Sequence, residues 1–372
     1  MTPIKIPSNI DRIEPYLPGK PIEEVERELG LQGSIKLASN ENPLGPSPRA
    51  LHAAHDMLSG ANRYPDGGGY YLRARLAERH HLPMDQIILG NGSTELVEIF
   101  ARTFLGAEGS AVMADQAFIM YRIAVMTVNG NARVVPLKAM RHDLSSMAEA
   151  IDESTRIVFI ANPNNPTGTQ VTHRELADFM NRVPPDLLVV VDEAYREYVE
   201  TPDYPDTLSM LAQGRRMAIL RTFSKIYGLA GLRLGYALTT SEVRLAAEKV
   251  RSPFNTSSLA QAAALAALDD QDHVDRSRAH NTRELRYLQD ELRRRGVPFT
   301  ESVANFVLVD TGTDSDLVFA RLLRLGVIVR PMSAYNLPSC VRVTVGTHDE
   351  NVRFLEALEI AMSDPHKRPP AL

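Results

Sequence analysis

Residues 187–195 read LLVVVDEAY, an apolar run that ends in two carboxylates. A strand that is apolar at every position is typical of a parallel sheet with helices on both faces. Expected helices at 71–79 and 93–104 lie among further short runs of this kind, at 86–89, 133–135, 156–160 and 217–220. Because strands that alternate with helices form right-handed βαβ units, we predict an α/β fold with a mainly parallel central sheet.

The composition changes at two places along the chain. Residues 1–45 are rich in proline and turn-forming residues, which favours an arm that wraps over a surface. After Pro253 we expect an alanine-rich helix at 259–268, a long charged helix at 274–295, and strands at 305–309 and 341–345. We therefore predict an arm at 1–45 that joins a smaller α+β domain at 253–372, and a large domain at 46–252.

Charge and cysteine content exclude several classes of protein. The 372 residues carry a net charge of −5, which lacks the basic footprint of a nucleic-acid binder. Cys340 is the single cysteine, so no intrachain disulfide forms. The chain shows neither a signal peptide nor an apolar run long enough to span a membrane, and we expect a cytoplasmic protein. The pair His80-His81 has no ligand pattern around it, so we expect solvated surface and no metal site.

The strongest chemical signal is the segment 222–233, TFSKIYGLAGLR. Lys225 follows an expected buried strand, where an unpaired ammonium group is costly. A surface lysine at the strand end is the simplest interpretation. However, Thr222 and Ser224 precede Lys225 and Arg233 follows it, and hydroxyl and guanidinium groups together suit a phosphate. A lysine beside a phosphate site suggests covalent attachment of a phosphorylated aldehyde.

Three other strand ends carry candidate site residues. Asp192 ends the run at 187–195, where ligands bind in open α/β sheets, although an aspartate there also serves as a helix N-cap. Residues 162–168, NPNNPTG, form either an ordinary turn or a ligand loop. Residues 89–95, LGNGSTE, place helix-start amides where a phosphate binds, but Glu95 breaks the dinucleotide fingerprint.

Taken together, these segments closely resemble the fold-type I aminotransferases, which depend on pyridoxal 5'-phosphate (PLP). The matching features are Asn165 in NPTG, Asp192 with Tyr195 three residues later, and Ser224-Lys225 with Arg233. The match keeps the family's order and spacing over nearly the whole chain. The resemblance implies the family's fold, with a large PLP-binding domain and a small domain.

The resemblance also implies roles for individual residues. Lys225 would hold the cofactor and carry the proton, with Asp192 on the ring nitrogen and Tyr195 and Asn165 on the phenolic oxygen. Phe118 would stack on the ring, although relatives often have tyrosine there. The phosphate contacts implied by the family are Ser93, Thr94, Thr222, Ser224, Arg233 and, from the second subunit of an obligate homodimer, Tyr64.

Further segments resemble the branch of this family that acts on histidinol phosphate. They are PYLPGK at 15–20, LASNENPLG at 37–45, RYPD at 63–66, GVIVRP at 326–331 and VRVTVGT at 341–347. This resemblance implies transamination of histidinol phosphate with 2-oxoglutarate to imidazole-acetol phosphate and glutamate, in histidine biosynthesis. Tyr16, Asn40, Arg330 and Arg342 are the implied substrate-binding residues, with Arg342 on an α-carboxylate and Arg330 on the distal phosphate.

Three alternatives share parts of this pattern. An aromatic amino acid aminotransferase has the same fold and chemistry. A phosphothreonine decarboxylase is close in sequence but breaks a different bond. A regulatory, non-catalytic aminotransferase-like domain is disfavoured because the lysine site is intact and no DNA-binding module precedes the match.

Overall fold

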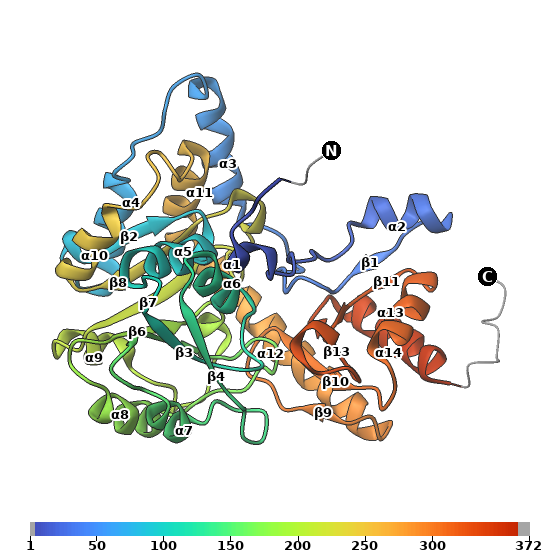
Figure 1. Cartoon of the computed structure of the whole chain (residues 1–372). Helices are drawn as coiled ribbons and strands as arrows, with labels where there is room; N and C mark the ends of the chain where they lie inside the picture. Colours follow the sequence, from blue (N-terminus) through green and yellow to red (C-terminus); the bar gives the residue numbers. More distant parts are fainter. Residues whose placement is uncertain (1–3, 364–372) are drawn as a thin grey trace.

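The computed structural model describes residues 4–363, and its centre is a seven-stranded sheet in the order β2-β8-β7-β6-β5-β3-β4 (Figure 1). The strands are β2 (Ile87–Gly90), β3 (Ser110–Ala114), β4 (Asn131–Val135), β5 (Thr155–Ala161), β6 (Leu188–Asp192), β7 (Met217–Thr222) and β8 (Gly235–Thr239). β8 runs antiparallel to both of its neighbours, whereas the other pairs are parallel. The predicted mainly parallel α/β sheet is therefore confirmed, while β3 and β8 were absent from the sequence prediction.

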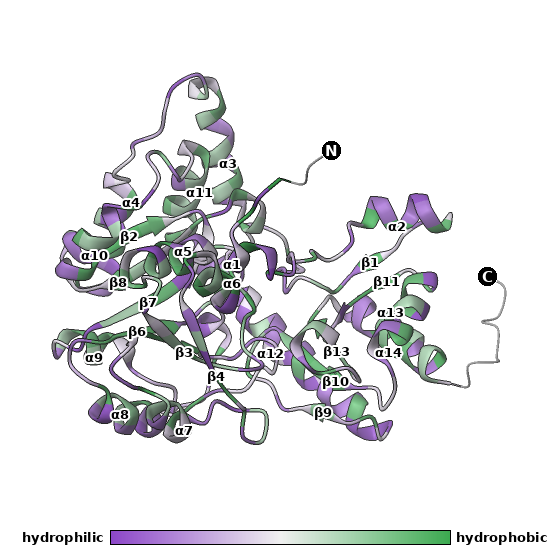
Figure 2. Ribbon diagram, in the orientation of Figure 1, coloured by the Kyte–Doolittle hydropathy of each residue, from purple (hydrophilic) through white to green (hydrophobic). Residues whose placement is uncertain are grey.

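Both faces of this sheet are buried, as the continuous apolar runs require. Within β6, Val189 and Val191 belong to one apolar cluster, and Leu188 and Val190 belong to the cluster on the opposite face. Complete burial of one such side chain stabilises the fold by about 1.5–3 kcal/mol. Figure 2 shows the result, with hydrophobic strands inside and hydrophilic residues gathered on outer helices such as α2 and α8.

Helices cover the two faces in separate groups. One apolar cluster takes its helical residues from α5 (Gly92–Phe104), α6 (Met120–Thr127) and α10 (Ser241–Glu248). The other takes them from α3 (Pro48–Asp56), α4 (Tyr70–His80), α7 (Leu144–Glu149), α8 (His173–Arg182), α9 (Thr207–Ala212), α11 (Ser258–Leu268) and the first turn of α12 (Gln271–Arg294). Capping supports several of these helices: Thr172 and Glu175 form a complete capping box at the start of α8.

A second, antiparallel sheet has the order β12-β13-β10-β9. Its strands are β9 (Phe299–Thr300), β10 (Phe306–Asp310), β12 (Arg330–Pro331) and β13 (Cys340–Thr344), and it packs with α12, α13 (Ser315–Arg324) and α14 (His348–Met362). The N-terminal arm joins this part, because β1 (Ile35–Lys36) pairs in parallel with β11 (Val327–Ile328). The arm also carries α1 (Ser8–Asp11) and α2 (Ile22–Leu29). The remaining elements are the short 3-10 helices η1 (Met57–Gly60), η2 (Met84–Gln86), η3 (Arg196–Tyr198), η4 (Ala230–Leu232) and η5 (Ser333–Tyr335).

Helix α11 follows the predicted domain boundary at residue 253 but packs with elements of the predicted large domain. It contacts α3 and α4, and these three helices lie together at one end of the molecule (Figure 1). Its buried alanines, Ala260, Ala263, Ala264 and Ala267, belong to the apolar cluster of the large sheet. Their small side chains allow α11 to approach α3 closely, and the composition of this segment alone does not reveal that partner. The boundary at residue 253 stays a prediction.

The expectation that His80-His81 is a solvated pair is wrong for His80. His80 is buried, not solvated, and its Nε2 lies 3.0 Å from the hydroxyl of Tyr236. Burial lowers the pKa of His80 to about 3, so the ring is neutral. Residues 4–363 contain no cluster of three or more histidine, cysteine, aspartate or glutamate side chains arranged to hold a metal. In the same range, no helix is both long enough and apolar enough to cross a membrane.

Candidate active site

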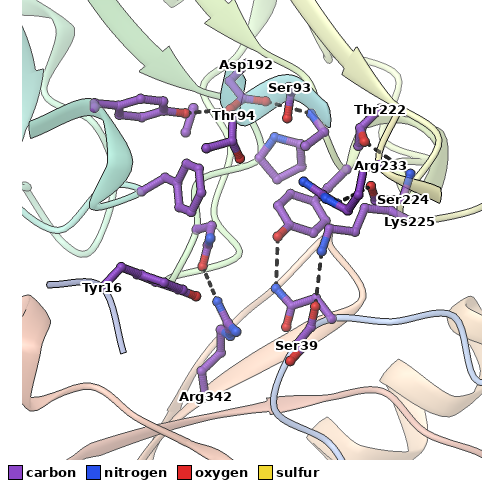
Figure 3. A pocket seen from close by; sticks show the side chains of 18 residues that line it. Tyr16, Ser39, Ser93, Thr94, Asp192, Thr222, Ser224, Lys225, Arg233 and Arg342 are labelled. Carbon is purple, nitrogen blue, oxygen red and sulfur yellow. Dashed lines mark hydrogen bonds between the residues drawn. The ribbon is translucent and has the colours of Figure 1, made fainter. Parts of the chain in front are cut away.

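The main pocket lies at the carboxyl ends of four neighbouring parallel strands. β3 leads to Phe118, β5 to the loop with Asn165, β6 ends at Asp192, and β7 leads to Lys225. Parallel strands place their carboxyl ends on one edge of the sheet, so residues distant in sequence meet there. The pocket has a volume of about 180 Å³ and is lined by Tyr16, Ser39, Asn40, Ser93, Thr94, Phe118, Tyr121, Ala161, Pro163, Asn165, Asp192, Ala194, Tyr195, Thr222, Ser224, Lys225, Arg233 and Arg342 (Figure 3).

Asp192 is a buried carboxylate on the floor of this pocket. Its Oδ1 accepts a hydrogen bond from the Ala194 amide at 3.1 Å, and its Oδ2 accepts one from the Tyr121 hydroxyl at 2.8 Å. Burial raises the pKa of Asp192 to about 6, although both hydrogen bonds lower it. The side chain does not cap a helix, because the chain continues into an irregular turn and the 3-10 helix η3. The capping alternative is therefore wrong.

Lys225 projects into the pocket and is not a surface lysine. Its Nζ donates a hydrogen bond to the Ser39 carbonyl at 3.1 Å and lies 5.5 Å from the centre of the Tyr195 ring. Burial, with the positive charges of Arg342 and Arg233, lowers the pKa of Lys225 from 10.5 to about 7. A substantial share of Lys225 is consequently an uncharged amine near neutral pH, which is the form that attacks an aldehyde.

One end of the pocket is built for an anion. The first turn of α5 begins at Gly92, which brings the amides of Ser93 and Thr94 to the pocket wall. Arg233 lies against this turn, since a Cβ on Gly92 would come within 2.5 Å of its Nη2. Arg233 Nη1 donates to Ser224 Oγ at 3.4 Å. Figure 3 shows Thr222, Ser224 and Arg233 gathered on the same side as Lys225.

The opposite end carries a buried cation. Arg342, on β13, donates to Asn165 Oδ1 at 2.5 Å and to the Ala38 carbonyl at 2.7 Å. These acceptors are neutral, and its buried Nε finds no partner among residues 4–363. A buried cation without a carboxylate partner is costly, and a bound anion would offset that cost. Asn40 donates to the Tyr195 hydroxyl at 2.9 Å.

Two of the sequence-predicted residues lie outside the pocket lining. Arg330 lies 5.1 Å from the ring centre of Tyr16, which does line the pocket, so Arg330 sits just behind the lining. Tyr64 is 83% exposed and stacks on Phe254, with ring centres 4.7 Å apart. The single chain therefore does not bring Tyr64 to its own pocket.

Several lining residues were not identified from the sequence. They are Ser39, Tyr121, Ala161, Pro163 and Ala194. Ser39 lies within the recognised segment 37–45, and Ala161, Pro163 and Ala194 adjoin recognised motifs, so their neighbours in sequence were a usable signal. The contacts themselves span long separations: Ser39 reaches Lys225 across 186 positions and Tyr121 reaches Asp192 across 71 positions. No local pattern signals contacts of that range.

Comparisons with known proteins agree with this geometry. The family model for aminotransferase class I and II matches residues 32–358. Histidinol-phosphate aminotransferase 1 of Nitrosococcus oceani is 46% identical over 96% of each chain, and the Moorella thermoacetica histidinol-phosphate aminotransferase is 47% identical over 93% of this chain and 90% of its own. The crystal structure of the Sinorhizobium meliloti histidinol-phosphate aminotransferase in complex with pyridoxal-5'-phosphate superposes with a TM-score of 0.88 at 28% identity, covering 96% of this chain and 97% of that one.

Proposed function

Because the chain belongs to aminotransferase class I and II, we propose that it is a PLP-dependent transaminase for histidinol phosphate. The reaction transfers the amino group to 2-oxoglutarate and yields imidazole-acetol phosphate and glutamate, a step of histidine biosynthesis. The observation that carries this proposal is the 46% identity to a histidinol-phosphate aminotransferase over 96% of both chains. The reaction occurs in the cytoplasm in our proposal.

The pocket fits PLP by the chemistry of its side chains. It has a cationic and amide-lined end for a phosphate, a largely uncharged lysine for an aldehyde, and a buried carboxylate for a pyridinium. We assign the phosphate contacts to Ser93, Thr94, Thr222, Ser224 and Arg233. Asp192 would pair with the ring nitrogen, Tyr195 and Asn165 with the phenolic oxygen, and Phe118 with the ring face.

When bound, PLP supplies a reactive aldehyde and a ring that accepts electrons from the substrate α-carbon. Lys225 would hold the cofactor aldehyde in the resting enzyme, and its amine, once displaced by the substrate amine, would move the proton from the substrate α-carbon. The low pKa of Lys225 suits this role, since an uncharged amine accepts a proton. The hydrogen bonds from Tyr121 and Ala194 favour the ionised form of Asp192 in its buried site, and a pyridinium partner would favour it further.

The substrate-binding residues are assigned by charge and position. Arg342 would bind the α-carboxylate of glutamate, because its fork geometry and free Nε suit a planar anion. Arg330, held beside Tyr16, would bind the phosphate of histidinol phosphate. Asn40 donates a hydrogen bond to the Tyr195 hydroxyl, so Asn40 would act on the substrate both directly and through Tyr195.

We also propose a homodimer in which Tyr64 completes the partner's phosphate site. Tyr64 is exposed in the single chain, and the same end of the molecule exposes Leu58, Tyr70, Tyr71 and Phe254. A group of exposed large apolar side chains is typical of a protein interface. A tyrosine hydroxyl delivered by that interface would donate a hydrogen bond to the phosphate.

A steady-state assay of glutamate formation tests this function. Purified protein, PLP, histidinol phosphate and 2-oxoglutarate should produce glutamate, and Lys225→Ala should abolish the activity. Phenylalanine serves as the competing amino donor. Turnover of phenylalanine without turnover of histidinol phosphate would replace the proposal with an aromatic aminotransferase.

A further inference from the structure

Tyr121 is buried beside Asp192 and is not among the residues assigned to the cofactor or the substrate. It lies at the start of α6, is 1% exposed, and its ring stacks on Phe159 with centres 5.0 Å apart and planes at 5°. Phe118 meets the same ring edge-on at 5.7 Å. The ring is thus fixed on two sides, which aims its hydroxyl at Asp192 Oδ2 at 2.8 Å.

The direction of this hydrogen bond is fixed. Burial and the neighbouring Asp192 charge raise the pKa of Tyr121 well above its ordinary value, so the phenol stays protonated. A carboxylate can only accept, and the hydroxyl must therefore donate to Asp192. The second oxygen of Asp192 accepts from the Ala194 amide. Two donors orient the carboxylate and favour its ionised form in a buried site.

We propose that Tyr121 is a positioning residue that keeps Asp192 ionised and aimed at the ring nitrogen of PLP. The inference rests on the proposed function, since it assigns Asp192 to that nitrogen. Two other charged groups act on Asp192. They are Lys225, which favours its charge, and Glu193, which opposes it. Glu193 is paired with Arg221 and Thr207, and within residues 4–363 Tyr121 is the one side-chain donor to Asp192.

Tyr121→Phe is the direct test, because it removes the hydroxyl and keeps the ring stacked on Phe159. The holoenzyme is dialysed against graded PLP concentrations to obtain the dissociation constant. Loss of one hydrogen bond to an ionised group should weaken PLP binding by about tenfold to a hundredfold. The acid limb of the kcat/KM profile should also move to higher pH, because Asp192 with one donor protonates more readily.

Tyr236→Phe is the matched control. Tyr236 is equally buried at 2% exposure and its hydroxyl bonds to His80, on the face of the sheet opposite Tyr121. This variant has a comparable structural cost but no contact with Asp192. Unchanged PLP affinity and an unchanged acid limb are expected. An equal loss of affinity in the two variants would overturn the inference, since it would indicate a general cost of removing a buried hydroxyl.

A double-mutant cycle separates action through Asp192 from direct effects. In an Asp192→Asn background, the side chain that accepts the hydrogen bond from Tyr121 is no longer charged. Tyr121→Phe should then change PLP affinity by less than about threefold. The same loss in both backgrounds would contradict the inference. If the unmodified chain itself fails to bind PLP, the proposed function fails. If it binds PLP and Tyr121→Phe binds equally well, only the role of Tyr121 fails.

Discussion

Lys225 shows how a single residue is made reactive by its surroundings. Burial opposes its positive charge, and Arg342 and Arg233 oppose it further, while Asp192 and Glu41 favour it. The result is a pKa near 7 rather than 10.5. A lysine of this kind is a candidate functional group on physical grounds alone.

The low pKa of Lys225 predicts the pH dependence of cofactor loading. The pKa is lowered, so the uncharged amine is scarce below about pH 7 and predominates above it. The rate at which PLP-free protein incorporates PLP should rise through pH 7 and then level off, as measured by growth of the visible absorption band. A free lysine derivative is the control and should rise only near its ordinary pKa. A protein profile that matches the free lysine would contradict the assignment.

Arg342 and Arg330 should differ in the half-reaction that they support. Histidinol phosphate has no carboxylate, so Arg342→Ala should mainly slow the glutamate half-reaction. Loss of one hydrogen bond to an ionic group costs about 1.5–3 kcal/mol, or roughly one to two powers of ten in kcat/KM. Arg330→Ala should slow the histidinol phosphate half-reaction, and glutamate too if its distal carboxylate uses Arg330.

Single-turnover kinetics of each variant with each substrate measure this difference. Equal damage to both half-reactions by Arg342→Ala would mean that Arg342 holds Asn165 and Ala38 in place and does not bind a carboxylate. In that structural role, Arg342 would act only through its hydrogen bonds to Asn165 and to the Ala38 carbonyl, which are both neutral acceptors.

At the level of individual residues, the sequence predicted the chemically functional side chains better than the side chains that hold them in place. Lys225, Asp192 and Arg233 stand in recognisable patterns after strands, and the structure brings them to one pocket. Tyr121 stands in no such pattern, because its partner is 71 positions away. Tyr64 was predicted to reach the phosphate of a second subunit; it is exposed in the single chain, and its place in a partner's pocket stays a prediction.

At the level of elements, continuous apolar runs identified most of the central strands, but β3 and β8 were missed. The sequence of β8, GYALT, begins with glycine directly after the expected phosphate loop, so it reads as part of that loop. Its antiparallel direction depends on pairing with β2 and β7, which local sequence does not determine. The alanines of α11 likewise give no sign of which sheet they cover.

The loop between β7 and η4 is held by a backbone contact that permits only glycine. Gly228 has φ +69°, and a Cβ there would overlap the carbonyl of Gly45 in the arm. Gly228→Ala should therefore combine the cost of a left-handed alanine with displacement of the arm. Gly214→Ala is the control, since Gly214 has φ +80° and open space around its Cα.

Chemical denaturation of the two variants measures the difference. Gly228→Ala should lower the free energy of unfolding by about 1–3 kcal/mol more than Gly214→Ala, because it adds overpacking to the shared backbone cost. Equal destabilisation would show that the arm yields freely at Gly45.

At the scale of the whole molecule, the proposed dimer makes a prediction about shared sites. One chain carries Tyr64→Phe with Lys225 intact, and the other carries Lys225→Ala with Tyr64 intact. A hybrid dimer would contain one site with both Lys225 and the partner's tyrosine hydroxyl. Co-refolded mixtures should be more active than either parent, in an assay with limiting PLP. Full activity in a species that sediments as a monomer would contradict the shared site.

The proposed function depends on which substrate donates its amino group to PLP. A single-turnover experiment decides this: the PLP form of the protein is mixed separately with histidinol phosphate, phenylalanine and phosphothreonine, and loss of the visible absorption band is followed. Histidinol phosphate should convert the cofactor much faster than the other two, because in our proposal Arg330 binds its distal phosphate and the site catalyses transamination. Conversion by phenylalanine with none by histidinol phosphate would contradict the account.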